Sequence, residues 1–495
     1  MIKRILLALL LVVGVLVVAV AGKTWLTPSR QIAVAPVAKP AIDAEAAAKR
    51  LSSAIVLHTV ASADDPTLNA AEFDKLHLLL AQQYPKLHAT LKKEVIGQHA
   101  LLYTWAGTDA KAPPIALMAH QDVVPIASGT EKSWSQDPFS GLVHDGYIWG
   151  RGTMDNKGNL LSQMEAIEML IGSGFQPKQT VYLIAGDDEE VNGLRGAKPI
   201  AELLKSRAVR LSWVLDEGLA VIDGVIGGLD RPAALVGLAE KGYGTFFLSL
   251  DAAPGHSSMP PPHSAIGTMG AALARLENDQ MPASIGGVAG EMFATLAPEM
   301  KGINRVMLSN LWLTTPLVKS QLEKNPSTNA TLRTTTALTI LQAGNKDNVL
   351  PGHVDAAVNF RLLPGDTLAS VEAHMRKALG NETIQVKSYA GNAEPSPISP
   401  TDNAGYRAIQ QTLRQEFPEA VVAPGLMTAA TDSRHMSIVS DAIYRFSPLR
   451  LGPQDLSRFH GTNERISVSN YAEMIKFYRQ LLINASGPIG PTPAL

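Results

Sequence analysis

The 495-residue sequence contains no cysteine, and this absence limits the chemistry that the chain can use. Disulfide bonds, thiolate zinc sites and a lipid-modified N-terminal cysteine are all excluded. Any transition metal must therefore be held by histidine, aspartate and glutamate, and the chain contains 12 histidines and 45 acidic residues.

The chain also lacks a strong net charge and any internal repeat. Its 43 basic and 45 acidic residues give a formal net charge of −2, so we expect no nucleic-acid partner. Hydrophobic residues make up 46% of the chain, as is typical of a globular enzyme. The length exceeds that of one ordinary hydrophobic core, which predicts two domains.

An uninterrupted apolar segment at residues 5–22 follows Lys3 and Arg4. Its length lies between the roughly 7–15 residues of a signal-peptide core and the roughly 20 of a spanning helix. Residues 1–23 are therefore interpreted as a membrane anchor or as a signal peptide cleaved near residues 19–21. Both alternatives predict export of the remaining chain. It would be membrane-anchored on the non-cytoplasmic side in the first case and secreted or periplasmic in the second.

Three predicted apolar strands deliver acidic residues or histidine at their carboxyl ends. The first leads to His120 and Asp122, the second to the four carboxylates at 187–190, and the third to Asp216. Such strand ends form ligand crevices in open α/β sheets. Four consecutive carboxylates repel each other unless cations are present, although a solvated acidic turn is the alternative. The strands span residues 115–118, 181–185 and 211–215.

A glycine-rich turn at 146–158 contains Asp155 and runs into a helix that begins near Lys157. Glycine this dense beside a carboxylate indicates a tight turn that holds Asp155 in one pose. An ordinary N-cap aspartate is the alternative interpretation.

A second domain is predicted from about residue 241, with the element order β-α-β-β-α-β of a ferredoxin-like sandwich. Its strands and helices are expected at 242–250, 264–276, 335–342, 354–363, 368–379 and 383–388, and the segment 282–333 is not assigned. The predicted division is a linker at 24–40, a first domain at 41–240, an inserted domain at 241–395, the rest of the first domain at 396–485 and a tail at 486–495.

The motifs together resemble the di-zinc aminoacylase and carboxypeptidase metallopeptidases over about residues 41–483. The matching residues, in order, are His120-x-Asp122, Gly152-x-x-Asp155, Asp188-Glu189-Glu190, Asp216 and His460. Within this family the chain is most similar to the carboxypeptidase S-like branch, which includes N-acyl-amino-acid synthase/hydrolases. The resemblance implies an α/β fold in which a zinc-exopeptidase-like mixed-sheet catalytic domain carries an inserted ferredoxin-like α+β lid domain.

The resemblance also implies two Zn²⁺ ions per chain. It makes His120 and Asp216 ligands of one ion, Glu190 and His460 ligands of the other, and Asp155 the bridge. Glu189 would be the general base and Asp122 would orient His120, with a cis peptide bond after Asp155. About four positive charges would be balanced by three carboxylates and a hydroxide, with both imidazoles neutral.

In the inserted domain the resemblance assigns His256 to oxyanion stabilisation, which in dimers comes from the partner subunit. Asn348 and Arg361 occupy positions that resemble substrate-contacting ones. Arg434 resembles an arginine that clamps a substrate carboxylate, a task suited to a planar bidentate donor. An exposed edge strand of this domain would favour a homodimer.

We therefore expect a zinc-dependent hydrolase that cleaves the amide bond of small-molecule or peptide substrates with a free carboxylate. Such substrates are peptides, as for a carboxypeptidase, or N-acyl amino acids. The alternatives are a mainly synthetic N-acyl-amino-acid synthase, a catalytically inactive exported binding domain, and a serine hydrolase using Ser257 with His256. No Gly-x-Ser-x-Gly motif supports the last of these.

Overall fold

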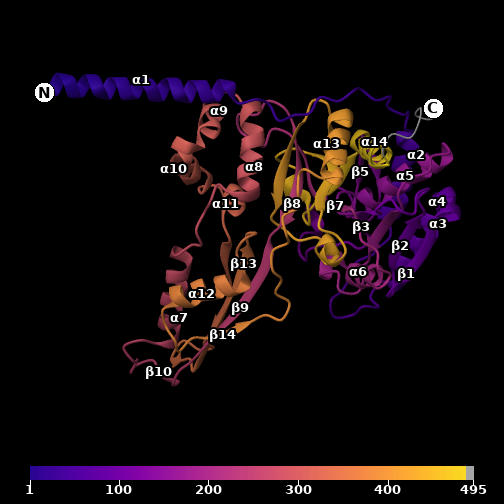
Figure 1. The fold of residues 1–495 in the computed structure, drawn as a ribbon. Helices are drawn as coiled ribbons and strands as arrows, with labels where there is room; N and C mark the ends of the chain where they lie inside the picture. The colour runs from indigo at the N-terminus through magenta and orange to yellow at the C-terminus, as the bar shows by residue number, and fades with distance from the viewer. Residues whose placement is uncertain (487–495) are drawn as a thin grey trace.

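The computed structural model describes residues 1–486 and has three parts (Figure 1). A long helix, α1 (Ile2–Leu26), extends away from the other parts. The body is built on a large mixed β-sheet, and a smaller lobe with its own sheet projects from it. Most of the predicted tail at 486–495 lies outside the described residues.

The body contains an eight-stranded sheet with the order β1-β2-β6-β3-β7-β16-β8-β15. Strand β3 pairs in parallel with β6 and with β7, so His120 lies opposite Gly186 of β6. The carboxyl ends of these strands therefore meet at one edge of the sheet. The strands are β1 (Lys92–Ile96), β2 (Ala100–Trp105), β3 (Ile115–His120), β6 (Val181–Gly186), β7 (Trp213–Ile222), β8 (Ala233–Glu240), β15 (Val421–Met427) and β16 (Ile443–Leu451).

Both faces of this sheet are covered, because successive strand residues point to opposite faces. Leu117 and Leu215 belong to the core under α2, α5, α13 and α14, whereas Met118 and Val214 pack in the core under α6. This two-sided burial explains why the strands are continuous apolar runs. The helices of the body are α2 (Ala44–Ile55), α3 (Ala70–Gln83), α4 (Pro85–Thr90), α5 (Lys157–Gly172), α6 (Ala197–Ser206), α13 (Ala404–Glu416) and α14 (Val468–Ala485).

A small sheet with the order β17-β5-β4 joins two loops that are distant in sequence. Arg465 of β17 pairs with Trp149 of β5. The loop that contains His460 is therefore held beside the turn that contains Asp155. The strands are β4 (Val143–His144), β5 (Tyr147–Trp149) and β17 (Arg465–Ser467).

The lobe consists of a four-stranded antiparallel sheet, in the order β11-β13-β9-β14, and two helices that share its apolar core. The sequence order of these elements is β-α-β-β-α-β, which confirms the predicted ferredoxin-like arrangement. The exact domain boundaries stay a prediction. The elements are β9 (Gly242–Asp251), α7 (Ala265–Asn278), β11 (Thr335–Ala343), β13 (His353–Leu362), α12 (Leu368–Leu379) and β14 (Gln385–Ser388).

Four helices fill the segment 282–333 that the sequence left unassigned. Leu296 and Met300 at the end of the first pack against Val421 and Ala423 of β15. The second lies against the C-terminal part of α1, which ends at Leu26 and so runs past the predicted limit at residue 23. The helices are α8 (Gly287–Leu296), α9 (Gly302–Ser309), α10 (Leu311–Leu322) and α11 (Pro326–Leu332).

Candidate metal centre and active site

His120 and Asp122 lie at the carboxyl end of β3 and are buried. His120 Nδ1 lies 2.9 Å from the carbonyl oxygen of Asp122 and 3.2 Å from its Oδ1. The Asp122 carboxylate also accepts the backbone N–H groups of Glu189 and Glu190, at 3.2 and 3.0 Å. Asp122 therefore fixes the His120 ring, with Nε2 facing outward, and ties it to the acidic loop after β6.

Asp155 lies between two imidazoles. Its Oδ1 is 3.0 Å from His120 Nε2, and its Oδ2 is 3.2 Å from His460 Nε2. His460 Nε2 is also 3.2 Å from Glu190 Oε2. The peptide bond between Asp155 and Asn156 is cis, as expected. One carboxylate thus presents a different oxygen to each histidine.

The turn around Asp155 is held by Glu464, a residue that the sequence analysis did not single out. Its Oε1 accepts the N–H groups of Gly152 and Met154 at 2.9 Å and that of Asp155 at 3.2 Å. Arg151 pairs with the other oxygen at 2.6 Å. Burial raises the pKa of Glu464 to about 7, although Arg151 opposes this effect. No local pattern could have revealed this contact, because Glu464 and Met154 are 310 residues apart.

The acidic pair at Asp216 and Glu217 lies within β7 and not after it, which corrects the expected strand end. The register of β7 against β16 shifts here, since Arg445 pairs with Asp216 but Phe446 pairs with Leu219. Glu217 and Gly218 are therefore extra residues on the β7 side. Gly218 has a φ of 144°, a backbone conformation that residues other than glycine rarely adopt.

This irregularity decides which of the two carboxylates faces His120. Asp216 was the expected ligand, but its Oδ2 accepts the N–H of Ser433 at 2.9 Å and its Oδ1 that of Glu217 at 2.9 Å. Glu217 Oε1 lies 3.2 Å from His120 Nε2. Sequence spacing cannot distinguish adjacent residues at a bulge, because the bulge changes which one points to the site.

Glu189 begins the short 3₁₀ turn η2 (Glu189–Val191), which follows the end of β6 after two residues. Its Oε2 lies 4.0 Å from His120 Nε2. Burial raises the pKa of Glu189 well above its ordinary value; the positive charge of His120 opposes this, and the negative charge of Glu217 adds to it.

The donor atoms in this region fit metal ions. Those of His120, Asp155 and Glu190 lie within 4.8 Å of one another, and so do those of His120, Glu189 and Glu217. Glu190 Oε1 is buried without a hydrogen-bond partner among the described residues. Burial raises the pKa of Glu217 to about 8, and Asp155 contributes to that rise. Cations would favour the ionised forms of these carboxylates.

The two predicted arginines lie on opposite sides of the junction between body and lobe. Arg434, in η4 (Asp432–Ile438), donates from Nη2 to the Asn192 carbonyl at 2.9 Å, close to the acidic loop. Arg361 of β13 lies 4.9 Å from the centre of the Tyr243 ring. Burial lowers the pKa of Arg361, Tyr243 opposes this, and the positive charge of Arg434 adds to it. The two guanidinium groups are thus close enough to influence each other.

His256 and Asn348 lie away from this cluster. They lie on or beside the short strands β10 (Gly255–His256) and β12 (Val349–Leu350), which pair with each other. Figure 1 shows β10 at the far end of the lobe. His256 is exposed, and its Nδ1 pairs with Ser258 Oγ at 2.8 Å and not with Ser257. A single chain therefore does not bring His256 to the carboxylates.

The carboxylates and imidazoles gathered at one edge of the sheet fit a metal-dependent enzyme. The family model described as peptidase family M20/M25/M40 matches residues 116–484, and the chain belongs to this family. Its membership identifies the chain as a metallohydrolase enzyme and confirms the suspected family.

Named relatives agree with this assignment. The chain is 43% identical to the N-fatty-acyl-amino acid synthase/hydrolase PM20D1.1 of Danio rerio, over 87% of this chain and 84% of the relative. It is 38% identical to the probable carboxypeptidase S-like 2 of Dictyostelium discoideum, over 88% and 84%. The suspected branch is therefore confirmed.

Solved structures support the fold. The M20 family metallo-carboxypeptidase Sso-CP2 from Sulfolobus solfataricus matches with a TM-score of 0.64 at 16% identity, over 89% of this chain and 99% of that one. Human carnosine dipeptidase 1 matches with a TM-score of 0.61 at 16% identity, over 91% and 100%. The predicted mixed-sheet fold is therefore confirmed.

Proposed function

We propose that the chain hydrolyses the amide bond of N-acyl amino acids, with two Zn²⁺ ions bound at the carboxylate cluster. The observation that carries this proposal is the Asp155 carboxylate, which offers one oxygen toward His120 and the other toward His460. Glu217 would complete the first site and Glu190 the second. Asp216, hydrogen-bonded to Ser433, would stand behind Glu217.

The zinc pair, when bound, supplies a Lewis acid for the amide carbonyl and lowers the pKa of a water molecule. The chain performs the proton transfers. Glu189 removes a proton from the attacking water and then delivers it to the amine nitrogen that leaves. Its position supports both roles, because its Oε2 lies 4.0 Å from His120 Nε2, beside the proposed metal ligands.

Two arginines, Arg434 and Arg361, would orient the substrate. Arg434 would hold the carboxylate of the amino-acid part through two parallel N–H donors. Its bond to the Asn192 carbonyl fixes it near the loop of Glu189 and Glu190. Arg361 would contact the substrate from the lobe, and Asn348 would do so only after the lobe moves or a second chain supplies it.

N-acyl amino acids are favoured because relatives named N-fatty-acyl-amino acid synthase/hydrolase share 38–43% identity with the chain. Peptide hydrolysis is the second candidate, supported by relatives named as carboxypeptidase S-like proteins. Because amide hydrolysis is reversible, the same site could condense a fatty acid with an amino acid when both are abundant.

The test is a hydrolysis screen of N-acyl amino acids against dipeptides, with metal content measured on the same preparation. We expect faster turnover of N-acyl amino acids, loss of activity with a chelator, and recovery when zinc is restored. Hydrolysis that is indifferent to chelation would contradict the metal mechanism. Preference for dipeptides would favour the carboxypeptidase alternative.

We also propose that α1 anchors the chain in a membrane. Among residues 1–486 it is the one helix long and apolar enough to span, with a mean hydropathy of 3.2 over a window that is not buried. Asn310 Nδ2 donates to Thr24 Oγ1 at 2.8 Å. In the helices on either side of Asn310, Ile303 of α9 and Trp312 of α10 are 70% and 54% exposed.

These exposed residues of α9 and α10 would lie on the bilayer that α1 enters. The full chain should therefore remain with membranes after a high-salt wash. Release into the soluble fraction after loss of α1 would indicate a cleaved signal peptide instead.

A homodimer through the lobe is proposed from its edge strand. Strand β11 ends the four-stranded sheet and exposes Leu338, Ile340 and Leu341. Exposed apolar edges of this kind favour pairing with another strand. A second copy would cover this edge and could bring His256 of the partner subunit to the carboxylates. Ile340→Lys should give a monomer by analytical ultracentrifugation if this interface exists.

A further inference from the structure

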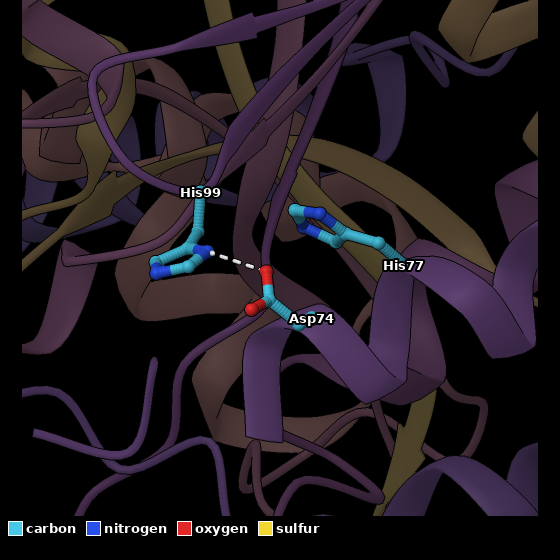
Figure 2. A group of neighbouring side chains, drawn as sticks. All are labelled: Asp74, His77 and His99. Atoms are coloured by element: carbon cyan, nitrogen blue, oxygen red, sulfur yellow. Dashed lines mark ion pairs between the residues drawn. The ribbon is translucent and has the colours of Figure 1, made fainter. Parts of the chain in front are cut away.

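A second group of metal-binding side chains lies outside the cluster described above. It consists of Asp74, His77 and His99, whose potential ligand atoms all lie within 4.8 Å of one another. Asp74 and His77 are about one turn apart on α3, and His99 is in the turn between β1 and β2. Figure 2 shows the Asp74 carboxylate between the two imidazoles. His99 Nδ1 lies 3.6 Å from Asp74 Oδ1.

The hydrogen bonds around His77 leave one ring nitrogen for a ligand role. His77 Nε2 lies 2.8 Å from Gln121 Oε1. The Gln121 amide nitrogen donates to the carbonyls of His99 and Ala185, so Oε1 must be an acceptor. His77 therefore donates from Nε2, and Nδ1 carries the lone pair. Metal-binding histidines use their second nitrogen in this way.

His99 presents a nitrogen that nothing else satisfies. Its Nδ1 is buried and has no hydrogen-bond partner among the described residues. The ring stacks on Phe73, with a centroid distance of 5.1 Å, which fixes its orientation. Burial lowers the pKa of His77 and of His99, which favours the neutral form that coordinates metals.

We propose that Asp74, His77 and His99 bind a third divalent transition-metal ion, such as Zn²⁺, separately from the catalytic pair. Ligand distances of about 2.0–2.2 Å in a tetrahedral site place ligand atoms roughly 3.3–3.5 Å apart. The 3.6 Å separation of His99 Nδ1 and Asp74 Oδ1 is near this value. The Asp74 side chain is 70% exposed and free to close the remaining gap, and water takes the fourth position.

The proposed site is connected to the active site through Gln121. This residue lies between His120 and Asp122, and it contacts both histidines of the new site. An ion there would hold His77 and His99 together against Gln121 and so stabilise the end of β3. The ion would share no ligand with the pair at Asp155.

The experiment measures zinc and cobalt binding to the purified full-length chain at controlled free-metal concentrations. We expect three ions per chain for the wild type and two for Asp74→Asn and His99→Ala. His353→Ala is the control, because His353 is a histidine outside the proposed site that lies between two aspartates, Asp251 and Asp355. This control should keep three ions.

Asp74→Asn is the decisive variant, because an exposed aspartate can be changed without loss of folding. Cobalt spectra should show the third equivalent binding through nitrogen and oxygen in the wild type only. Two ions in the wild type, or three in both Asp74→Asn and His99→Ala, would overturn the proposal. Asp155→Asn separates it from the proposed function, since that change should remove the catalytic pair and leave the third ion.

Discussion

The body and the lobe differ in where they place charge. In the body, His120 and Asp122 are buried at the end of β3, and Asp216 is buried within β7. In the lobe, the core under α7 and α12 is apolar, and His256 and Asn348 are exposed. A buried charge is costly unless paired or bound to a metal. The difference therefore indicates that the body carries the chemistry and the lobe contributes contacts from its surface.

The largest expected effect tests the chemistry of the body. Glu189→Gln keeps the size of the side chain but cannot accept a proton. We expect kcat to fall by about 10²–10⁴-fold, with metal content unchanged. Glu277→Gln, on the exposed face of α7, is the control and should have no effect. If the Glu189→Gln enzyme kept most of its rate, Glu189 would not be the general base.

The lobe is tested by His256→Ala. If His256 of the partner subunit stabilises the oxyanion, kcat should fall by about 10²–10³-fold, the cost of one such donor. Metal content should not change. His353→Ala serves as control, because His353 is an exposed lobe histidine that pairs with Asp251 and Asp355. Equal rates for the two variants would show that the lobe takes no part in the chemical step.

Within the body, the adjacent acids at the β7 bulge can be separated by metal affinity. Glu217→Gln removes a carboxylate 3.2 Å from His120 and should lose one ion of the pair. Asp216→Asn removes a group hydrogen-bonded to Ser433, so its affinity loss should be about 10–100-fold, as for outer-shell partners. Metal titration of both variants decides the assignment. If Asp216→Asn loses an ion and Glu217→Gln only binds metal more weakly, Asp216 is the ligand.

The junction between the two parts is tested by Arg434→Ala. Loss of a charge-assisted bond of about 1.5–3 kcal/mol should raise KM roughly 10-fold or more for substrates with a free carboxylate. Their amide analogues should change little, because they lack the charge that Arg434 would bind. KM measured for matched acid and amide substrates gives the answer. An equal rise for both would eliminate the carboxylate clamp.

The smallest effect concerns Lys241, which links β8 of the body to β9 of the lobe. Its Nζ donates to the carbonyls of Ala330 and Arg333, and burial lowers its pKa to about 7. Between about pH 7 and 10.5 the unfolded chain binds more protons than the native one. The free energy of unfolding should therefore rise with pH, by at most about 1.4 kcal/mol per unit.

Denaturant titrations across this pH range test that slope. Lys241→Met should flatten it, because methionine does not titrate. Lys377→Met, at an exposed position of α12, should leave it unchanged. If the free energy of unfolding of the wild type does not change above pH 7, Lys241 remains charged in the folded protein.

Much of the fold was predictable from local patterns. Apolar runs that end in His120 and in the carboxylates at 187–190 predicted strands whose ends meet, and they do. Periodicity also gave the β-α-β-β-α-β order of the lobe. Segment 282–333 was not predictable, because its short helices pack partly on α1 and β15, which lie far away in the sequence.

The sequence by itself determined most of the strands and helices outside segment 282–333, and most of the acids and imidazoles that gather at one sheet edge. Only the tertiary structure decided that Glu217 faces His120, that Glu464 holds the Asp155 turn, and that two histidines approach Asp74. The physical reason is the separation along the chain of the residues that interact. Hydrophobic periodicity is local, whereas a shifted strand register and contacts over hundreds of residues depend on how the whole chain packs.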